Sequence, residues 1–352
     1  MPTAEQVIDE ILADPLRHVA GAGGALGYVG LDVPPDILLT PGRVGCHLPW
    51  QLRTPTPLAD AWLENSFPAW ARSILQRWAE GRYAVFGQVI FTRGEDVSQR
   101  LYYYVCELQR QGKIAGPEPL IFDIARIPRE ASRRYSVAAL RQLTDALGLD
   151  AAALRQGIRR ANGLRRIFGG LQATRAAAGS LYERVVRASL FADLTDVLPD
   201  WTPQSGGNVS GRVLLLGSVP PDDGLHRAVE AEGWSVVREI SDRTLDRFGE
   251  PVRADTEDPA GAIAQGWLRQ RFLGRDFSDP AERVEAVLAS ARPDVAIGWF
   301  GREDEALAWQ VPALADALRA HAVPTLMLTA RAGDGSDGAG DEIRAFIRGR
   351  RS

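Results

Sequence analysis

Two adjacent carboxylates, Glu95 and Asp96, stand where an expected strand gives way to an expected helix. A carboxylate at such a junction can act as a general acid or base, because ligands of parallel sheets bind beyond the carboxyl ends of the strands. Acidic residues at a helix start also stabilise the helix dipole by a few tenths to about 1 kcal/mol, so a purely structural role stays open. Asp36 offers the same choice, since it follows two prolines at the start of an apolar helical turn.

Other reactive residue types form no recognisable constellation. Cys46 and His47 are neighbours in a loop-like stretch and offer two metal-ligand types, but a single pair is weak evidence for a metal site. Cys106 falls inside an expected helix, where a small buried thiol is the simpler interpretation. The four histidines have no ligand spacing, and neither a Gly-x-Ser-x-Gly elbow nor a Walker loop is present. We therefore predict no metal site.

Composition places the chain among folded globular proteins of about two domains. It has 352 residues, of which 45% are hydrophobic and 24% charged, and its formal net charge is −4. That balance predicts no general attraction to nucleic acid or to an anionic membrane. The start is polar and acidic and the longest apolar runs are far below the roughly 20 residues that span a bilayer. We expect a cytoplasmic protein.

The first lobe is expected over residues 1–200, as an α/β unit with a helical extension. Two strands alternate with helices, and a glycine cluster at 21–27 is interpreted as a connector because a helix, not a strand, precedes it. The expected strands are 83–91 and 119–123, and the expected helices are 3–20, 69–80, 97–109, 134–148, 150–177 and 180–198.

The second lobe is expected over residues 211–352, after a Gly/Ser/Pro-rich linker at 200–210. Near-continuous apolar strands alternating with helices predict a parallel sheet that is covered on both faces. The expected strands are 213–217, 234–237, 294–298 and 324–328, and the helices are 222–232, 259–270, 280–291, 304–320 and 340–349. The predicted fold class is α/β, with two Rossmann- or flavodoxin-like lobes, parallel sheets and helical additions.

The order of these segments resembles the large-subunit family of (R)-2-hydroxyacyl-CoA dehydratases and benzoyl-CoA reductases, over nearly the whole chain. No single motif is highly specific, and the ordered set carries the resemblance. Its members are GYVGLDVPPDILLTPG at 27–42, RSIL at 72–75, DVSQRLYYYV at 96–105, RVLLLG at 212–217, VEAEGWSVV at 229–237 and GDEIRAFI at 340–347.

The resemblance implies a [4Fe–4S] cluster held by three cysteines, yet this chain departs from that pattern. The three corresponding places are occupied by Ser66 (or Pro68), by Glu95 of the Glu95–Asp96 pair, and by the glycine of Trp299-Phe300-Gly301-Arg302. None carries sulfur, and two cysteines are too few for the usual all-thiolate ligation. We expect no cofactor on this chain, with a [4Fe–4S] cluster possible in a partner subunit.

The resemblance also places candidate site residues in a cleft between the lobes. Asp36 takes the place of the family's glutamate near the substrate hydroxyl, one methylene shorter, and Asp96 matches the family's aspartate. Together with Glu95 these are the candidate catalytic acids. Substrate-side candidates are Ser66, Trp299, Phe300 and Arg302, and core packing is the structural alternative for the last three.

Three functions follow from this pattern. The first is a clusterless subunit that completes an acyl-CoA pocket beside a related cysteine-bearing subunit, as a heterodimer or by self-association. The second is a repurposed non-redox enzyme that uses Glu95, Asp96 and Asp36 on a thioester or carbonyl. The third is a two-lobed small-molecule binding protein.

Overall fold

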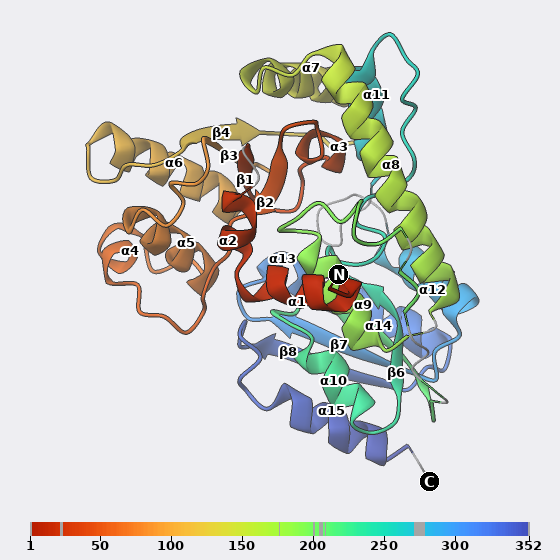
Figure 1. The fold of residues 1–352 in the computed structure, drawn as a ribbon. Coiled ribbons are helices and arrows are strands. Elements are labelled where there is room, and N and C mark those ends of the chain that lie inside the picture. Colours follow the sequence, from red (N-terminus) through yellow and green to blue (C-terminus); the bar gives the residue numbers. More distant parts are fainter. Residues whose placement is uncertain are drawn as a thin grey trace. The chain divides into compact units, whose positions relative to one another are not determined.

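The computed structural model describes residues 2–21, 24–175, 177–199, 201–203, 207, 209–270 and 279–350. These residues form two compact units, each with a parallel sheet of four strands (Figure 1). The first unit comprises the described residues within 1–168, 188–201 and 248–270, and the second those within 169–187, 202–247 and 271–352. The predicted α/β class with two parallel sheets is confirmed.

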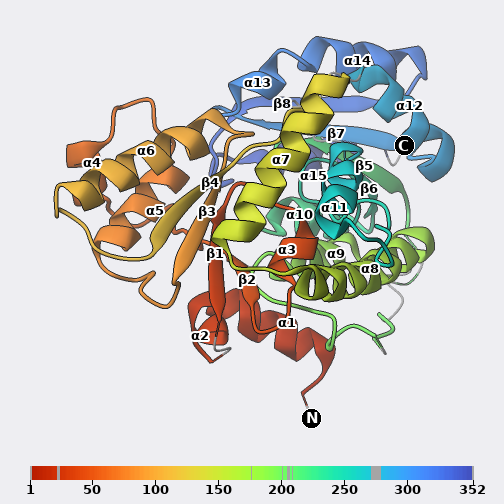
Figure 2. The same ribbon diagram turned by 90° about the horizontal axis from the view of Figure 1, so that it is seen from above.

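The first sheet has the strand order β2–β1–β3–β4, and all its pairs are parallel. Its strands are β1 (Ala25–Val29), β2 (Val44–His47), β3 (Gln88–Thr92) and β4 (Glu118–Phe122). In Figure 2, α5 and α6 lie on one side of these strands, and α3 and α7 on the other. The helices of this unit are α1 (Ala4–Ala13), α2 (Pro15–Ala20), α3 (Pro35–Leu38), α4 (Pro57–Trp62), α5 (Ala69–Ala79), α6 (Asp96–Arg110), α7 (Glu130–Ala146), most of α8 (Ala151–Thr174) and α11 (Pro259–Leu268), which packs on α7.

The second sheet has the order β6–β5–β7–β8, again all parallel. Its strands are β5 (Arg212–Gly217), β6 (Ser235–Ile240), β7 (Val295–Gly301) and β8 (Thr325–Arg331). One hydrophobic cluster joins the sheet to α10 (Gly224–Glu230) and α15 (Ala339–Arg348), and another joins it to α12 (Pro280–Ala291) and α14 (Val311–Ala320). The apolar residues of these strands are thus buried on both faces, as their sequence predicts. Two further helices, α13 (Glu305–Ala308) and most of α9 (Gly179–Ala188), also belong to this unit.

The two sheets share one strand order, in which the second strand in the chain lies outside the first. This is the flavodoxin-like order, whose ligands bind at the point where the strand order reverses, between the first and third strands. At that point each unit has a glycine with positive φ, Gly30 at +85° and Gly217 at +119°. A Cβ on Gly30 would lie 2.0 Å from Oγ1 of Thr92, and one on Gly217 would lie 2.2 Å from the carbonyl oxygen of Trp299. Both positions therefore require glycine.

The first sheet differs from its prediction, because β1 and β2 were not expected. The glycine cluster interpreted as a connector enters β1 at Ala25. Gly27 lies inside that strand, and a glycine is needed there because a Cβ would come within 2.7 Å of Val89 Cγ2. Glycine and small residues obscure the apolar pattern by which strands are recognised.

Several boundaries also move for local reasons. The expected helix at 3–20 breaks into α1 and α2 because Asp14 ends the first and Pro15 starts the second. The expected helix at 304–320 divides into α13 and α14, with Pro312 in the first turn of α14. The expected strand at 83–91 begins later, at Gln88 of β3. The expected helix at 180–198 ends earlier, at Ala188.

The expected lobes 1–200 and 211–352 each contain one sheet, but two segments belong to the opposite unit. Residues 169–187 join the second unit and residues 248–270 join the first. Residues 248–270 belong to the first unit because α11 packs on α7. A single boundary at a linker cannot describe such an assignment. Of the expected linker at 200–210, residues 200, 204–206 and 208 lie outside the described residues.

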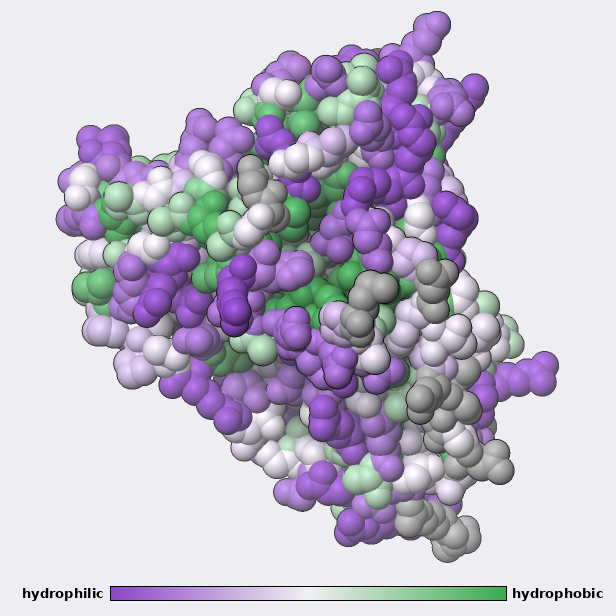
Figure 3. All heavy atoms as spheres, in the orientation of Figure 1, coloured by the Kyte–Doolittle hydropathy of each residue, from purple (hydrophilic) through white to green (hydrophobic). Residues whose placement is uncertain are grey.

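Hydrophilic residues are spread widely over the face of the molecule drawn in Figure 3. Among the described helices, none combines the length and apolar composition that a membrane crossing requires.

Candidate functional site

Asp36 is the predicted catalytic acid that the structure buries most completely. It lies in α3, beyond the carboxyl end of β1, and its side chain is 1% exposed. Both carboxylate oxygens accept hydrogen bonds from Arg165 of α8, at 2.8 Å from Nη1 and 2.7 Å from Nη2. The Arg165 side chain is 2% exposed, and its Nε donates to the carbonyl of Phe248 at 2.9 Å. Asp36 is thus bound at both oxygens by a rigid guanidinium fork.

A neighbouring residue of α8 fixes the same region. The Asn162 side chain donates from Nδ2 to the carbonyl of Val252 at 2.7 Å and accepts from the Val252 N–H at 3.0 Å. Its oxygen also accepts a hydrogen bond from Arg165 at 2.8 Å. Asn162 thus ties Val252 to α8, and it also contacts Arg165, the residue that holds Asp36.

A second buried ion pair at this end of the sheet was missed by sequence reasoning. Asp32, two residues after Gly30, pairs with Arg126, which follows β4, and their side chains are 4% and 7% exposed. Asp32 also accepts a hydrogen bond from Nε1 of Trp267 in α11, at 2.8 Å. Arg126 donates to the carbonyl of Gln270 at 2.7 Å. An acid directly after a strand was the available signal, and it was lost because β1 was not recognised.

Two other predicted residues come together on the surface of the first unit. Asp96 begins α6 with a side chain that is 78% exposed, and it lies 3.6 Å from Arg100. Ser66 is also exposed, and its hydroxyl accepts a hydrogen bond from Arg100 at 2.9 Å. Glu64 binds Arg100 at 2.7 Å and accepts from Tyr104 at 3.0 Å. Ser66 and Asp96 thus share one arginine in a surface network.

Glu95 occupies the N-cap position of α6 and is half-buried. It directly precedes Asp96, which belongs to the surface network with Ser66 and Arg100. An N-cap acid matches the structural alternative, in which the carboxylate stabilises the start of the helix. Its catalytic role stays a prediction.

The substrate-side candidates of the second unit follow one another along β7. Trp299 is 2% exposed and belongs to the cluster under α10 and α15. Phe300 is also 2% exposed, but it belongs to the cluster under α12 and α14. Successive strand residues point to opposite faces, so the two rings cannot line one pocket together. Arg302 is exposed, and its backbone N–H donates to the carbonyl of Arg331 at 2.8 Å.

A buried polar network near the ends of β5 and β6 is the feature of the second unit that sequence reasoning did not find. Glu239 of β6 lies 2.8 Å from His226 Nε2 and 2.8 Å from Arg175 Nη2. Burial raises the pKa of the Glu239 carboxyl, but Arg175 and His226 outweigh it and lower that pKa to about 2. Nearby, Glu183 of α9 accepts from Arg243 at 2.7 Å and from Arg187 at 3.1 Å.

Glu183, His226, Glu239 and Arg243 of this network line a cavity of about 10 Å³, which also borders Ser218 and Ser241. That volume is about enough for one water molecule. Within the described part of the chain, Nδ1 of His226 has no hydrogen-bond partner, although the side chain is 1% exposed. The cavity is polar and small, so it suits a water bound to His226 rather than a substrate.

Ser218 links the loops after the first and third strands of the second sheet. Its hydroxyl oxygen accepts a hydrogen bond from the Gly301 N–H at 3.0 Å and donates to Asp304 at 2.9 Å. This hydroxyl is therefore engaged on both sides, in the way that a structural bridge requires.

The cysteine donors do not fit an iron–sulfur cluster. Cys46 lies in β2 with no exposed surface, and burial raises the pKa of its thiol. Cys106 lies in α6 and is half-buried. Cluster ligation uses thiolates, and these two thiols belong to separate elements of the first unit. Among the described residues, no group of three or more histidine, cysteine, aspartate or glutamate side chains could hold a metal ion.

Four of the buried acids, Asp32, Asp36, Glu183 and Glu239, are each bound to an arginine, and the exposed acid Asp96 lies beside one. No model of a known protein family and no curated protein matches this sequence.

Proposed function

We propose that this chain is a non-catalytic, cluster-free subunit of a complex like the 2-hydroxyacyl-CoA dehydratases and benzoyl-CoA reductases. In this proposal it completes the acyl-CoA pocket beside a related subunit, whose cysteines carry the [4Fe–4S] cluster. The two chains form a heterodimer, and the chemistry takes place on the partner.

The observation that carries the proposal is the double hydrogen bond between Asp36 and Arg165, at 2.8 and 2.7 Å. By the family resemblance, Asp36 stands in the place of the acid nearest the substrate. A general acid or base must reach a substrate proton with a lone pair or a proton of its own. A carboxylate buried to 1% exposure and engaged at both oxygens does not offer that group.

The residues at the family's ligand positions support the same conclusion. Ser66 is bound by Arg100, Glu95 sits at the start of α6, and Gly301 donates its N–H to Ser218. None of the three provides a soft ligand for iron. The shared strand order of the two sheets is compatible with a pair of Rossmann-like units.

The test is co-expression with a cysteine-bearing member of the same family from the same genome. We expect a 1:1 complex whose iron and acid-labile sulfide are retained by the partner when the subunits are separated. Each protein expressed alone is the control. A chain that stays monomeric with every such relative, or that binds the iron itself, would contradict the proposal.

A second measurement separates this proposal from the acid/base alternative. Glu95→Gln should leave the turnover of the complex within about twofold of wild type if the subunit is non-catalytic, whereas a positioned acid or base contributes at least about 10²-fold. Ser66→Ala in the same surface region is the matched control. A hundredfold loss in Glu95→Gln alone would favour the repurposed enzyme.

A further inference from the structure

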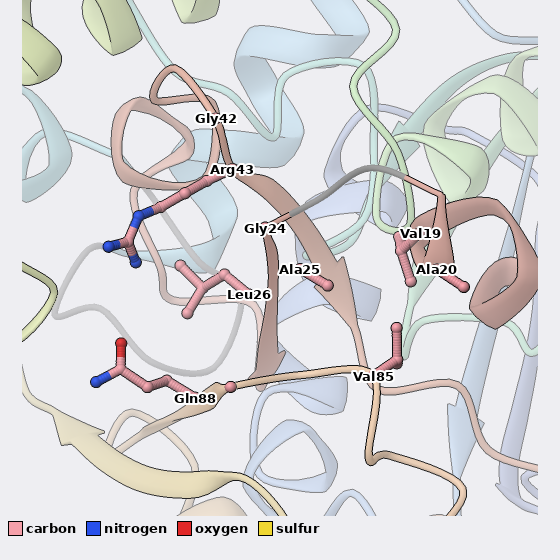
Figure 4. Close-up of a pocket in the computed structure, with 10 residues that line it drawn as sticks. Val19, Ala20, Gly24, Ala25, Leu26, Gly42, Arg43, Val85 and Gln88 are labelled. Carbon is pink, nitrogen blue, oxygen red and sulfur yellow. The ribbon is translucent and has the colours of Figure 1, made fainter.

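The first unit has an open cavity of about 400 Å³ at the amino end of its sheet (Figure 4). Figure 4 shows Arg43 and Gln88 on one side of β1 and Ala25 on the other. Gln88 donates both hydrogens of Nε2, to Glu118 and to the last carbonyl of α7, and Arg43 donates to the carbonyl of the next residue. These polar side chains are thus bound within the chain, and we assign no ligand to the cavity.

The two sheets have four edge strands, and three of them are obstructed. Along β2, the His47 N–H donates to the carbonyl of Leu190 at 2.7 Å. Along β6, the start of α9 lies close by, because a Cβ on Gly179 would come within 3.0 Å of the carbonyl oxygen of Val236. Along β4, Pro119 has no N–H to offer, and edge strands commonly carry proline to prevent pairing with other chains.

The fourth edge strand, β8, has none of these obstructions among the described residues. It is seven residues long, contains no proline, and has Leu328 as its one buried residue, whereas most residues of β5, β6 and β7 are buried. Its one charged residue, Arg331, stands at its carboxyl end. A long, partly exposed edge strand of this kind is a template for pairing with another strand.

The outer backbone groups of β8 follow from its ladder with β7. The Ala296 N–H donates to the carbonyl of Pro324 at 2.9 Å, and alternate residues of a strand face the same neighbour. Thr325 and Met327 therefore direct their N–H and C=O groups away from β7. In the part of the chain that the structure describes, no hydrogen bond engages these outward backbone groups.

The hydrophobic layers on both faces of the second sheet reach β8 but do not cover it. Leu326 packs against the cluster under α10 and α15, and Met327 packs against the cluster under α12 and α14. Both side chains are only partly buried. A strand added beside β8 would remove both from water, which favours association.

The charges around this edge suit a second copy of the same chain. Helices α14 and α15 contact β8, and every charged residue of these three elements belongs to an ion pair of opposite signs. Two identical surfaces with such balanced charges can meet without repulsion, as a two-fold contact between copies requires. The pairs are Arg319–Asp316, Arg331–Glu342, Arg344–Asp341 and Arg348–Glu232.

We propose that two copies of this chain pair β8 against β8 in antiparallel orientation, joining their second sheets into one continuous sheet. A two-fold axis beside Leu326 sets Thr325 of one copy opposite Met327 of the other, and each such pair exchanges two N–H···O bonds. At the axis the two Leu326 side chains form the closer, non-hydrogen-bonded type of pair. This contact is independent of the proposed subunit role, because none of its residues is a candidate site residue.

The first test measures the mass of the full chain, expressed alone, by sedimentation and light scattering from about 1 to about 100 μM. We expect monomers to become dimers as the concentration rises, with slower amide exchange in peptides that cover β8. Met327→Pro removes an outward N–H that β7 does not use, and it should weaken the dimer by about tenfold or more. Ile121→Pro is the matched control, because it makes the same kind of change on the edge strand β4 and should leave the dimer intact.

A charge exchange at Leu326 tests the two-fold axis without relying on proline. Leu326→Lys and Leu326→Glu should each be monomeric, because like charges would lie directly opposite each other, and their equimolar mixture should form a 1:1 dimer. Circular dichroism checks that each variant is folded.

A wild-type chain that stays monomeric at about 100 μM, or a dimer that both Met327→Pro and the Leu326 variants leave intact, would overturn the proposal. If the chain alone is monomeric and Met327→Pro instead loses binding of a related subunit, β8 pairs with that subunit and not with a second copy. Failure of self-association leaves the proposed subunit role untouched, because that role is tested by co-expression with a relative.

Discussion

Asp36 and Arg165 are 129 residues apart in the sequence, yet they form a two-point ion pair whose side chains are 1% and 2% exposed. A buried pair of this kind contributes little as a whole, because desolvation offsets the attraction. Removing one partner is costly, because the other charge stays buried without compensation. The pair is therefore a structural lock in the region where an acid was predicted to act.

Asp36→Ala should lower the free energy of unfolding by about 3–5 kcal/mol, because it leaves the Arg165 guanidinium unpaired in the interior. Urea denaturation followed by fluorescence measures this change. Asp96→Ala is the control, and it should cost less than about 0.5 kcal/mol since its pairing with Arg100 is exposed. The double variant Asp36→Leu/Arg165→Met should recover most of the loss, and a double variant as unstable as Asp36→Ala would contradict the lock.

Glu239 should make stability depend on acid pH. Its folded-state pKa of about 2 lies below the ordinary value of 4.5, so its contribution is fully present above about pH 4.5 and is lost as the pH falls toward 2. The shift corresponds to roughly 3–4 kcal/mol at most, by the conversion of about 1.4 kcal/mol per pKa unit.

The variant Glu239→Gln isolates this contribution. Unfolding free energies of wild type and variant, measured between pH 6 and pH 2, should converge as the pH falls. Glu107 has a similarly low pKa but is exposed, so Glu107→Gln serves as a control with little effect on stability. A constant difference between wild type and Glu239→Gln across this range would refute the pKa assignment.

Gly30→Ala should destabilise the first unit more than Gly42→Ala does. Both positions have positive φ, which costs an alanine on the order of 1 kcal/mol or more. At Gly30 the new Cβ would also meet Thr92 Oγ1 at 2.0 Å, whereas at Gly42 it meets no atom within 4 Å. The clash should add about 1–3 kcal/mol, measured by urea denaturation, and equal losses would show that the contact with Thr92 relaxes freely.

The two thiols should differ in reactivity. Burial raises the pKa of both thiols, but Cys46 has no exposed surface and Cys106 is half-buried. Since the thiolate is the nucleophile, iodoacetamide at pH 8 should modify Cys106 slowly and leave Cys46 intact until the protein unfolds. Peptide mass spectrometry distinguishes the sites, and Cys106→Ser should abolish native-state labelling. Modification of Cys46 before Cys106 would contradict the burial of β2.

The sequence predicted the second sheet well because each of its strands contains a short apolar run, although the expected strand at 234–237 stops before the Arg238–Ile240 end of β6. It predicted only half of the first sheet, where Gly27 and Gly45 interrupt the apolar pattern of β1 and β2. Losing β1 also hid Asp32, which follows it. Asp36 was identified as a candidate acid from its place at the start of an expected helical turn. Its burial and its pairing with Arg165 were not predicted.

The residue types alone determined that this is a globular α/β protein with apolar strands, few thiols and acids at helix starts. Only the tertiary structure decided which of these acids are paired with an arginine. All basic residues except Lys113 are arginine, so the sequence offers many possible partners for each carboxylate. The partner of Asp36 comes from α8 and that of Asp32 from the loop after β4, because folding brings distant segments into one low-dielectric interior. Local sequence patterns indicate secondary structure and burial, whereas ion pairing depends on contacts between residues far apart in the sequence.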